Sequence, residues 1–503
     1  MGSAEPEVRA AAGMVRGREE GGVAVFRGIP FAQAPVGGLR FGAPRPVRRW
    51  EGVREAADFG PPPPQSAALG GPGAPLSPQF TDTDWLTVNV WSPGGVSERL
   101  PVMVWIYGGA YMLGHAGDAA YDGAVLARHG VVVVTFNYRV GMEGFAQIEG
   151  APANRGLLDQ VAALAWVRDN IAAFGGDPGR VTVFGQSAGA GSVASLLGMP
   201  RAAGLFRRAV AQSVPGTFFS AELAADIAGA AAAELGLRAT VADLAGVEPG
   251  RLVGAGDAVA AKMAQYEGRW GAVAHSPMPF SPVVDGEVLP QAPWQALAAG
   301  SARDVELIVG HNRDEYRLFV ALAGQLGRIT DEQAVTALRV FAPGADGPGA
   351  YRAAYPGAGA GELYERVHTD LFAVPSQRLA QAHVQGGGRA YLYELTWSSP
   401  AMDGALGSCH ILDVPLVFGN FGVGMALLVM GDAAPPEAAA LSERMRTAWT
   451  SFAADGDPGW PAYDNEHRLT RIWDVEPSVT AYPEETARLM WCDHEFSALP
   501  LLA

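Results

Sequence analysis

The chain has very little cysteine: Cys409 and Cys492 are the only two among its 503 residues. Two thiols by themselves cannot build a disulfide framework or a structural zinc site, so we expect both to be reduced. The first residues lack the apolar stretch of roughly 7 to 15 residues that a signal peptide needs, and no run of about 18 apolar residues occurs anywhere. These absences predict a globular, cytoplasmic protein that does not span a membrane.

Positive charge is also scarce. The chain carries 36 basic and 52 acidic residues, a formal net charge of −16, and Lys262 is its only lysine. An acidic surface repels nucleic-acid phosphates and anionic lipid, which argues against partners of either kind. We interpret the excess carboxylates as solvated groups that maintain solubility.

Apolar residues, in contrast, are abundant at 49%, and three runs of them predict buried strands: Val102–Ile106, Val131–Phe136 and Val181–Phe184. These runs do not alternate with polar residues, which is typical of strands covered on both faces of a parallel sheet. Between the second and third runs, Leu157–Phe174 has apolar residues at helical spacing and is followed by a glycine-rich stop signal. Strand, helix and strand together predict an α/β fold.

Further segments extend this pattern. We expect strands at Val305–Val309 and Ala390–Leu395, and helices within Ala221–Glu267 and over Asp331–Phe341. Pro61–Pro78 is rich in proline and glycine and is predicted to be a surface loop, because apolar strands resume directly after it.

A candidate nucleophile stands between the third strand and a helix of small residues. Gly185, Ser187 and Gly189 form the pattern G-x-S-x-G, in which a sharp strand-to-helix turn exposes the serine hydroxyl and leaves no space for flanking side chains. With 65 glycines in the chain an ordinary glycine turn is the alternative. The buried strand before the motif and the helix after it favour a nucleophile.

Six motifs in order resemble the type-B carboxylesterases, the family that includes bacterial p-nitrobenzyl esterases and cholinesterases. The resemblance implies an α/β-hydrolase fold, with a central mostly parallel sheet flanked by helices and helical excursions forming a cap over the active site. It implies one domain over residues 1–503, with a largely helical cap at about 217–375 that also carries the catalytic acid. The motifs are FRGIPFAQAPVGGLRF (Phe26–Phe41), VMVWIYGGAYMLG (Val102–Gly114), NYRVGMEGF (Asn137–Phe145), NRGLLDQ (Asn154–Gln160), NIAAFGGDPGRVTVFGQSAGA (Asn170–Ala190) and DVPLVFGN (Asp413–Asn420).

The resemblance also implies a catalytic triad of Ser187, Glu315 and His410. The residues alone leave alternatives open, because Asp314 adjoins Glu315 and five histidines follow it in the chain. By resemblance the backbone N–H groups of Gly109, Ala110 and Ala188 form an oxyanion hole. The glycines let the main chain approach a substrate carbonyl closely.

Two departures from the family pattern stand out. Gln186 replaces the usual glutamate before the nucleophile, which argues against selectivity for quaternary ammonium esters. Trp85 replaces a cysteine of the family's loop disulfide, which fits a reducing compartment. For the substrate pocket we predict Gln186 and five aromatic residues, although aromatic residues in such segments also occur as simple core. These residues are Tyr107, Phe218, Phe219, Tyr316 and Phe319.

The function predicted is hydrolysis of small to medium, uncharged carboxylic esters through a covalent acyl-enzyme, without a metal or organic cofactor. Because His410 must be neutral to act as a base, activity should rise as the pH climbs through roughly 6 to 7. The alternatives are the same chemistry on carbamates, amides, lactones or thioesters and, more distantly, a non-catalytic binding protein of this fold. A monomer and a dimer are both compatible with the sequence.

Overall fold

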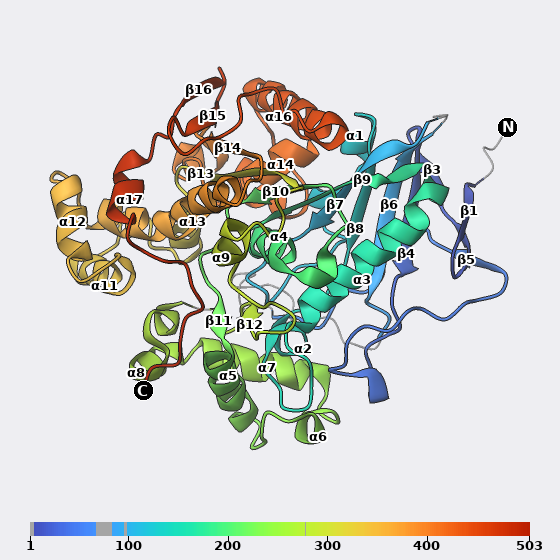
Figure 1. Ribbon diagram of the computed structural model, residues 1–503, viewed down its shortest axis with the longest axis horizontal. Coiled ribbons are helices and arrows are strands. Elements are labelled where there is room, and N and C mark those ends of the chain that lie inside the picture. Colours follow the sequence, from blue (N-terminus) through green and yellow to red (C-terminus); the bar gives the residue numbers. More distant parts are fainter. Residues whose placement is uncertain (1–4, 67–82, 95–97, 277) are drawn as a thin grey trace.

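An eleven-stranded sheet dominates the computed structural model, which describes residues 5–66, 83–94, 98–276 and 278–503 (Figure 1). Its strand order is β16-β15-β14-β13-β10-β9-β7-β8-β6-β4-β3, and all neighbours from β8 to β15 are parallel. The parallel strands are β7 (Leu100–Ile106), β8 (Val132–Phe136), β9 (Gly176–Gln186), β10 (Arg208–Gln212), β13 (Glu306–Asn312), β14 (Ala390–Leu395) and β15 (Leu469–Trp473). All five predicted strands are therefore confirmed.

The edges of the sheet are antiparallel and are formed by the ends of the chain. They are β3 (Arg18–Glu20), β4 (Val23–Pro30) and β6 (Thr87–Pro93) on one side and β16 (Ser478–Ala481) on the other. Two small sheets lie outside it: β1 (Glu7–Ala10) with β2 (Gly13–Arg16) and β5 (Val53–Glu55), and β11 (Phe219–Ser220) with β12 (Val283–Val284).

The predicted strand–helix–strand unit is present, but its two strands are not neighbours. Both β8 and β9 pair with β7, which lies between them, so the crossover through α3 (Arg155–Asn170) passes over one strand. The predicted helix Leu157–Phe174 corresponds to α3 and the 3-10 turn Ile171–Phe174 that continues it.

Helices cover both faces of the sheet. In Figure 1, α3, α4 (Ala188–Gly198), α9 (Pro293–Ala298) and α13 (Ala360–Gln385) form a contacting row in front of the strands. A second group, which packs together against the sheet, comprises α1 (Ala124–Ala127), α14 (Asp413–Phe418) and α16 (Pro436–Asp455). The sheet is thus buried on both sides, which is why its strands read as continuous apolar runs.

The remaining helices belong to neither of these two groups. The segment predicted to be helical over Ala221–Glu267 contains α5 (Ala221–Ala233), α6 (Val241–Leu244) and α7 (Pro249–Ala260), followed by α8 (Glu267–Trp270). After β13 come α10 (Arg317–Leu322), α11 (Asp331–Phe341), whose bounds match the prediction, and α12 (Gly347–Ala354). The short helices α2 (Gly141–Phe145), α15 (Leu427–Met430) and α17 (Glu485–Met490) complete the set. Residues 61–66 of the predicted loop Pro61–Pro78 lie outside helices and strands, and residues 67–78 lie outside the described residues.

A buried ion pair joins two of the sequence motifs. Arg139, in the segment after β8, forms a bidentate pair with Asp159 on α3, with nitrogen–oxygen distances of 2.7 and 2.8 Å and no exposed surface on either side chain. Because each charge is paired and hydrogen-bonded, the desolvation cost of burial is offset.

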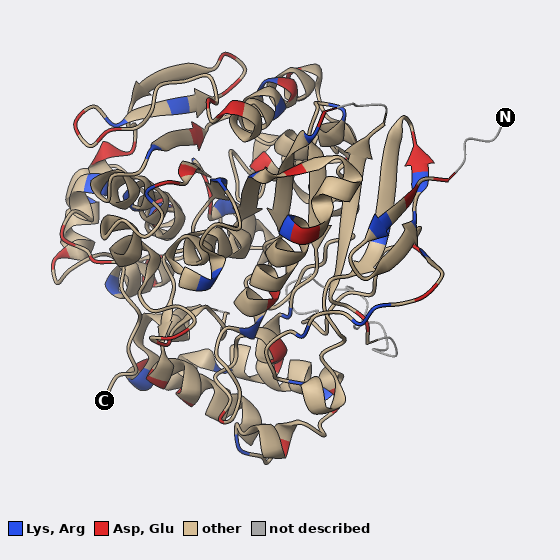
Figure 2. Ribbon diagram, turned by 45° about the vertical axis from the view of Figure 1, so that its right-hand side comes forward, with Lys and Arg blue, Asp and Glu red and all other residues tan. Residues whose placement is uncertain are grey.

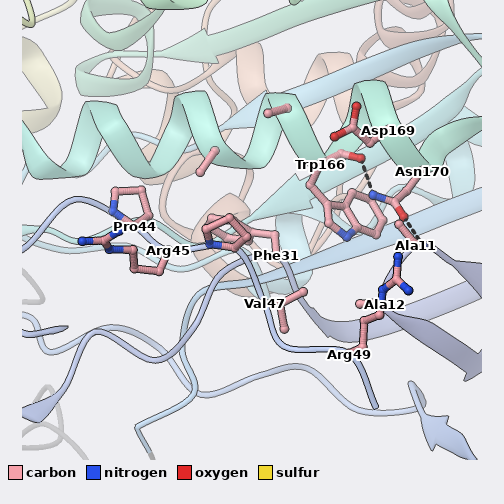
Figure 3. Close-up of a pocket in the computed structure, with 13 residues that line it drawn as sticks. Ala11, Ala12, Phe31, Pro44, Arg45, Val47, Arg49, Trp166, Asp169 and Asn170 are labelled. Carbon is pink, nitrogen blue, oxygen red and sulfur yellow. Dashed lines mark hydrogen bonds between the residues drawn. The ribbon is translucent and has the colours of Figure 1, made fainter. Parts of the chain in front are cut away.

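The N-terminal small sheet is attached to α3 through one amide side chain. Asn170 accepts a hydrogen bond from the Ala11 N–H at 2.7 Å and donates one to the Trp166 carbonyl at 2.8 Å, as Figure 3 shows. A surface cavity of about 340 Å³ lies beside this contact, lined in part by Phe31 and Trp166. Over the whole ribbon, Lys and Arg positions are interspersed with Asp and Glu positions (Figure 2).

Candidate active site

Ser187 lies on a tight elbow between β9 and α4. Its backbone angles, φ 58° and ψ −124°, are rare for a residue with a side chain, and such strain is characteristic of functional positions. A β-carbon at Gly189 would collide with the Ile106 carbonyl, and one at Gly185 would lie 2.7 Å from the Gly189 backbone. The two glycines are therefore required by close backbone approach, and Ser187 alone in the motif is partly exposed.

Glu315 and His410 meet at the carboxyl end of the sheet. Glu315 follows β13, His410 lies in the segment between β14 and α14, and His410 Nδ1 is 2.5 Å from Glu315 Oε2. The other carboxylate oxygen, Oε1, accepts a hydrogen bond from the Asn312 N–H at 2.8 Å. With Nδ1–H donating to a carboxylate, the neutral imidazole presents Nε2 as an acceptor.

The residue before the nucleophile contacts that acceptor. Gln186 ends β9 and is buried, and its Nε2 lies 3.0 Å from Nε2 of His410. Within the described part of the chain this amide, and not the Ser187 hydroxyl, is the hydrogen-bond partner of His410 Nε2. Hydrogen bonds of a catalytic group are often long in a structure without substrate and shorten when substrate binds.

Asp314, the competing acid, has another partner. Its carboxylate accepts a hydrogen bond from the Ser408 N–H at 2.9 Å and pairs with Arg317 at 3.3 Å. Among the competing histidines, His368 and His383 each bond to a backbone carbonyl, those of Tyr364 and Val305. Among the described residues, Glu315 and His410 are the only predicted acid and base candidates whose side chains are hydrogen-bonded to each other.

The predicted oxyanion-hole segment follows β7 and packs on the elbow. A β-carbon at Gly108 would lie 2.8 Å from the Gln186 carbonyl oxygen and 3.1 Å from Cβ of Ser187. Gly109 and Ala110 have φ angles of 109° and 55°, and no described carbonyl or side chain accepts a hydrogen bond from their N–H groups. Ala188 is the first residue of α4, where a backbone N–H has no intrahelical acceptor.

The predicted pocket residues separate into two groups. Tyr107, Phe218 and Phe219 are buried in the core, where Tyr107 stacks on Tyr138 and Phe218 packs edge-on against Trp294. Their burial agrees with the alternative interpretation, in which such aromatic residues are part of the core.

Tyr316 and Phe319, in contrast, are partly exposed and lie on the histidine's side of the site. The Phe319 ring is centred 5.1 Å from the His410 ring, and Tyr316 packs against Phe319 at 5.1 Å. Phe372 on α13, which sequence analysis missed, lies 4.8 Å from His410 and is nearly parallel to Phe319. Helical spacing places Phe372 on the buried face of α13, but no motif marks it as a neighbour of the histidine.

A second buried carboxyl group stands three residues after His410. Asp413 Oδ2 accepts hydrogen bonds from Gln212 Nε2 at 2.8 Å and from the Tyr393 hydroxyl at 2.9 Å, and burial raises the pKa of this carboxyl. Gln212 also accepts a hydrogen bond from the Ser187 N–H through its backbone carbonyl, at 2.9 Å. Gln212 therefore connects the elbow to Asp413, a link for which the sequence carries no signal beyond the motif Asp413–Asn420.

Among the described residues, no group of three or more histidine, cysteine, aspartate or glutamate side chains is arranged to hold a metal ion. Cys409 and Cys492 are not bonded to each other; Cys409 is buried and Cys492 is exposed. None of the described helices combines the length and apolar character needed to cross a bilayer.

A mostly parallel sheet covered by helices on both faces, with a serine on a strand-to-helix elbow, defines the α/β-hydrolase fold. The sequence profile of the carboxylesterase family matches residues 4–341 and 357–486. The chain is 37% identical to para-nitrobenzyl esterase from Bacillus subtilis (strain 168) over 95% of its own length and 96% of the relative's. It is 34% identical to phenmedipham hydrolase from Pseudarthrobacter oxydans, with 96% of each chain covered.

Solved structures agree with this assignment. A thermophilic para-nitrobenzyl esterase superposes with a TM-score of 0.84 at 35% identity, covering 97% of this chain and 100% of the other. The carboxylesterase of Geobacillus stearothermophilus superposes with a TM-score of 0.83 at 34% identity, covering 96% and 99%. The protein belongs to the carboxylesterase family and is an enzyme of the ester-hydrolysing class.

Proposed function

We propose that the protein hydrolyses uncharged carboxylic esters through a triad of Ser187, His410 and Glu315. The observation that carries the proposal is the 2.5 Å contact between His410 Nδ1 and Glu315 Oε2. Nε2 of the same ring lies 3.0 Å from the amide of Gln186, the residue before the strained turn at Ser187. Glu315 stabilises one tautomer of the imidazole, so that Nε2 is free of a proton and can act as the base.

In the proposed mechanism, His410 Nε2 takes the Ser187 hydroxyl proton while the serine oxygen attacks the ester carbonyl carbon. The tetrahedral intermediate collapses to an acyl-enzyme when His410 returns the proton to the departing alcohol. Water then repeats the sequence and releases the carboxylic acid. In each half of the reaction His410 takes up one proton and gives it back, and Glu315 stabilises the imidazolium that forms transiently.

The oxyanion of each intermediate would accept hydrogen bonds from the N–H groups of Gly109, Ala110 and Ala188. Support comes from the packing of the glycine segment on the elbow and from the N–H groups of Gly109 and Ala110, which have no acceptor among the described residues. Pre-oriented donors of this kind stabilise charge that develops only in the transition state.

The substrate pocket that we propose lies over Phe319 and Phe372, with Tyr316 beside them. Two nearly parallel rings, 6.3 Å between centroids, flank the imidazole and form an apolar wall without charge. Such a wall favours acyl or alkoxy groups that are apolar, and the relatives named para-nitrobenzyl esterase and phenmedipham hydrolase make aryl substrates the first to test. A helical cap at about residues 217–375 would complete the pocket.

The test is hydrolysis of p-nitrophenyl esters from acetate to laurate by the wild type and Ser187→Ala, with one aryl carbamate and one anilide included. Ser195→Ala is the matched control, because Ser195 lies on the same helix and its hydroxyl bonds to the Gly191 carbonyl. We expect turnover to disappear in Ser187→Ala and to persist in Ser195→Ala, and a fluorophosphonate to label the peptide that contains Ser187. Turnover by Ser187→Ala comparable to that of the wild type would refute the mechanism.

We also propose a cytoplasmic location, supported by two cysteines that are not bonded to each other and by Trp85 in place of a disulfide cysteine. Fractionation of the native host with an antibody against the protein tests it, and recovery outside the cytoplasm would contradict it.

A further inference from the structure

The segments that carry the acid and the histidine are bonded to each other along their backbones. The Asp314 N–H donates to the Ser408 carbonyl at 2.8 Å, and the His410 N–H donates to the Glu315 carbonyl at 3.2 Å. These contacts lie around a parallel bridge in which Asp314 and Cys409 are partners. The distance from imidazole to carboxylate therefore depends on how firmly this bridge is held.

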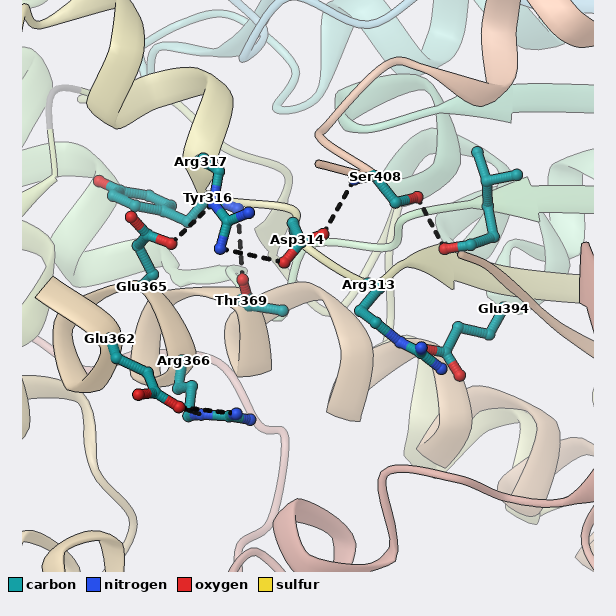
Figure 4. Close-up of polar contacts among 11 residues, drawn as sticks. Arg313, Asp314, Tyr316, Arg317, Glu362, Glu365, Arg366, Thr369, Glu394 and Ser408 are labelled. Carbon is teal, nitrogen blue, oxygen red and sulfur yellow. Dashed lines mark hydrogen bonds and ion pairs between the residues drawn. The ribbon is translucent and has the colours of Figure 1, made fainter. Parts of the chain in front are cut away.

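One side chain completes the bridge. Asp314 Oδ2 accepts a hydrogen bond from the Ser408 N–H at 2.9 Å, as Figure 4 shows, so that Asp314 bonds to Ser408 through both its backbone and its carboxylate. Ser408 is fully buried, and its N–H would lose its protein acceptor without this carboxylate. A carboxylate is a strong acceptor for a backbone N–H, and a buried donor without a partner is costly.

The local sequence is arranged for this contact. Gly407 has φ +58°, and a β-carbon there would collide with the Asp314 carboxylate and the Arg317 guanidinium. Arg317 lies 3.3 Å from Asp314 Oδ1 and donates to Glu365 on α13 at 2.9 Å, as Figure 4 also shows. Asp314 is thereby held between the histidine segment and α13.

We propose that Asp314 is a positioning residue of the esterase, which holds residues 407–410 so that His410 stays between Glu315 and Ser187. The inference rests on the proposed function. Among the described residues, the side-chain partners of Asp314 are Ser408 and Arg317, and Asp314 acts through the backbone of Ser408, two residues before His410. Other contacts, such as that from Asn312 Nδ2 to the Cys409 carbonyl at 2.7 Å, hold other atoms of the segment and remain when Asp314 is replaced.

The position of the His410 imidazole affects turnover more than it affects substrate binding. A displacement of about 1 Å in a catalytic group can reduce a rate by about 100-fold, whereas an apolar wall that binds the ester is unaffected by it. Replacement of Asp314 by alanine should therefore lower kcat and leave KM nearly unchanged.

The experiment compares Asp314→Ala and Asp314→Asn with matched changes at Asp177. Asp177 is also partly buried, also pairs with an arginine, Arg180, at 3.0 Å, and also accepts a hydrogen bond from a backbone N–H, that of Gly179, at 2.9 Å. It lies at the start of β9, outside the proposed triad, its supporting bridge and the proposed cap. The two aspartates thus offer the same chemistry in different surroundings.

For Asp314→Ala we expect kcat for p-nitrophenyl butyrate to fall at least about tenfold with KM within about threefold, and fluorophosphonate labelling of Ser187 to slow by the same factor. Asp314→Asn, which keeps an oxygen acceptor for the Ser408 N–H, should retain kcat within about threefold. Asp177→Ala and Asp177→Asn should show thermal midpoints lowered to a similar extent and an unchanged kcat.

Equal kcat values for Asp314→Ala and Asp177→Ala would overturn the proposal, as would equal losses in Asp314→Ala and Asp314→Asn. Should Asp314→Ala fail to fold, Gly407→Ala tests the same contact, because its methyl group displaces the carboxylate while every hydrogen-bonding group remains. Unchanged kcat in Gly407→Ala would then refute the role of Asp314. Activity that persists in Ser187→Ala refutes the proposed function instead, so that the two failures are distinguishable.

Discussion

Replacement of Gln186 by glutamate tests the electrostatics of the proposed base most directly. In the structure the buried Gln186 amide lies 3.0 Å from His410 Nε2, and Nδ1 of the same ring faces Glu315. The amide can donate a hydrogen bond to the neutral imidazole, whereas an ionised carboxylate at the same place can only accept one. Gln186→Glu should therefore favour the imidazolium, which cannot take a proton from Ser187.

The size of the effect follows from the distance. Two opposite unit charges about 3 Å apart at an effective dielectric constant of about 20 attract each other by about 5 kcal/mol. Burying the new carboxylate offsets several kcal/mol of this attraction. A neighbouring opposite charge typically changes the pKa of a group by about 1 to 3 units. We expect the acid limb of the kcat/KM profile to move to higher pH by about 1 to 2 units.

The assay is the pH dependence of kcat/KM for p-nitrophenyl butyrate, followed at the isosbestic wavelength of nitrophenol between about pH 5 and 9. Gln377→Glu is the matched control, because Gln377 is also fully buried and donates to the Tyr463 hydroxyl at 2.7 Å, away from the proposed triad. An unchanged acid limb in folded Gln186→Glu, or an equal shift in Gln377→Glu, would show that Gln186 does not act on the imidazole.

Three further predictions concern other parts of the molecule. Burial raises the pKa of Asp370 to about 7 from the ordinary 3.8, so that between these pH values the folded protein holds a proton that the unfolded chain releases. The free energy of unfolding should therefore fall as the pH rises from about 4 to about 7, by at most about 4 kcal/mol. Asp370→Asn should remove this fall; urea unfolding at both ends of the range measures it, and parallel curves for wild type and variant would contradict it. Phe372→Ala removes an aromatic ring beside His410 and should raise KM for p-nitrophenyl laurate more than KM for the acetate. It should also lower the free energy of unfolding by about 3 kcal/mol. Equal KM changes across the ester series would place Phe372 outside the pocket. Gly189→Ala forces a methyl group against the Ile106 carbonyl and should lower kcat at least about tenfold, whereas Gly229→Ala, in a helix with open space around it, should not; equal activities would argue against the elbow.

Much of the fold could be predicted from the sequence because its signals are local. Residues 102–106, 131–136 and 181–184 are runs of mainly apolar residues, which are typical of strands covered on both faces of a sheet, and the structure confirms all three strands. The pattern around Ser187 was also readable, since it depends on neighbours within a few residues: the glycines must be there because the Ile106 and Gly189 backbones leave no room for a β-carbon.

The tertiary structure decided the contacts between residues that are far apart in the chain. Whether Asp314 or Glu315 faces His410 depends on how two segments 95 residues apart pair with each other, and adjacent side chains on such a bridge point in different directions. The Gln186 amide meets His410 across 224 residues, and Phe372 reaches the same ring from a helix that carries no motif. The place of β7 between β8 and β9 likewise follows from how the crossover packs. Local periodicity states which face of an element is buried, but the partner on that face is chosen by packing and loop closure over the whole chain.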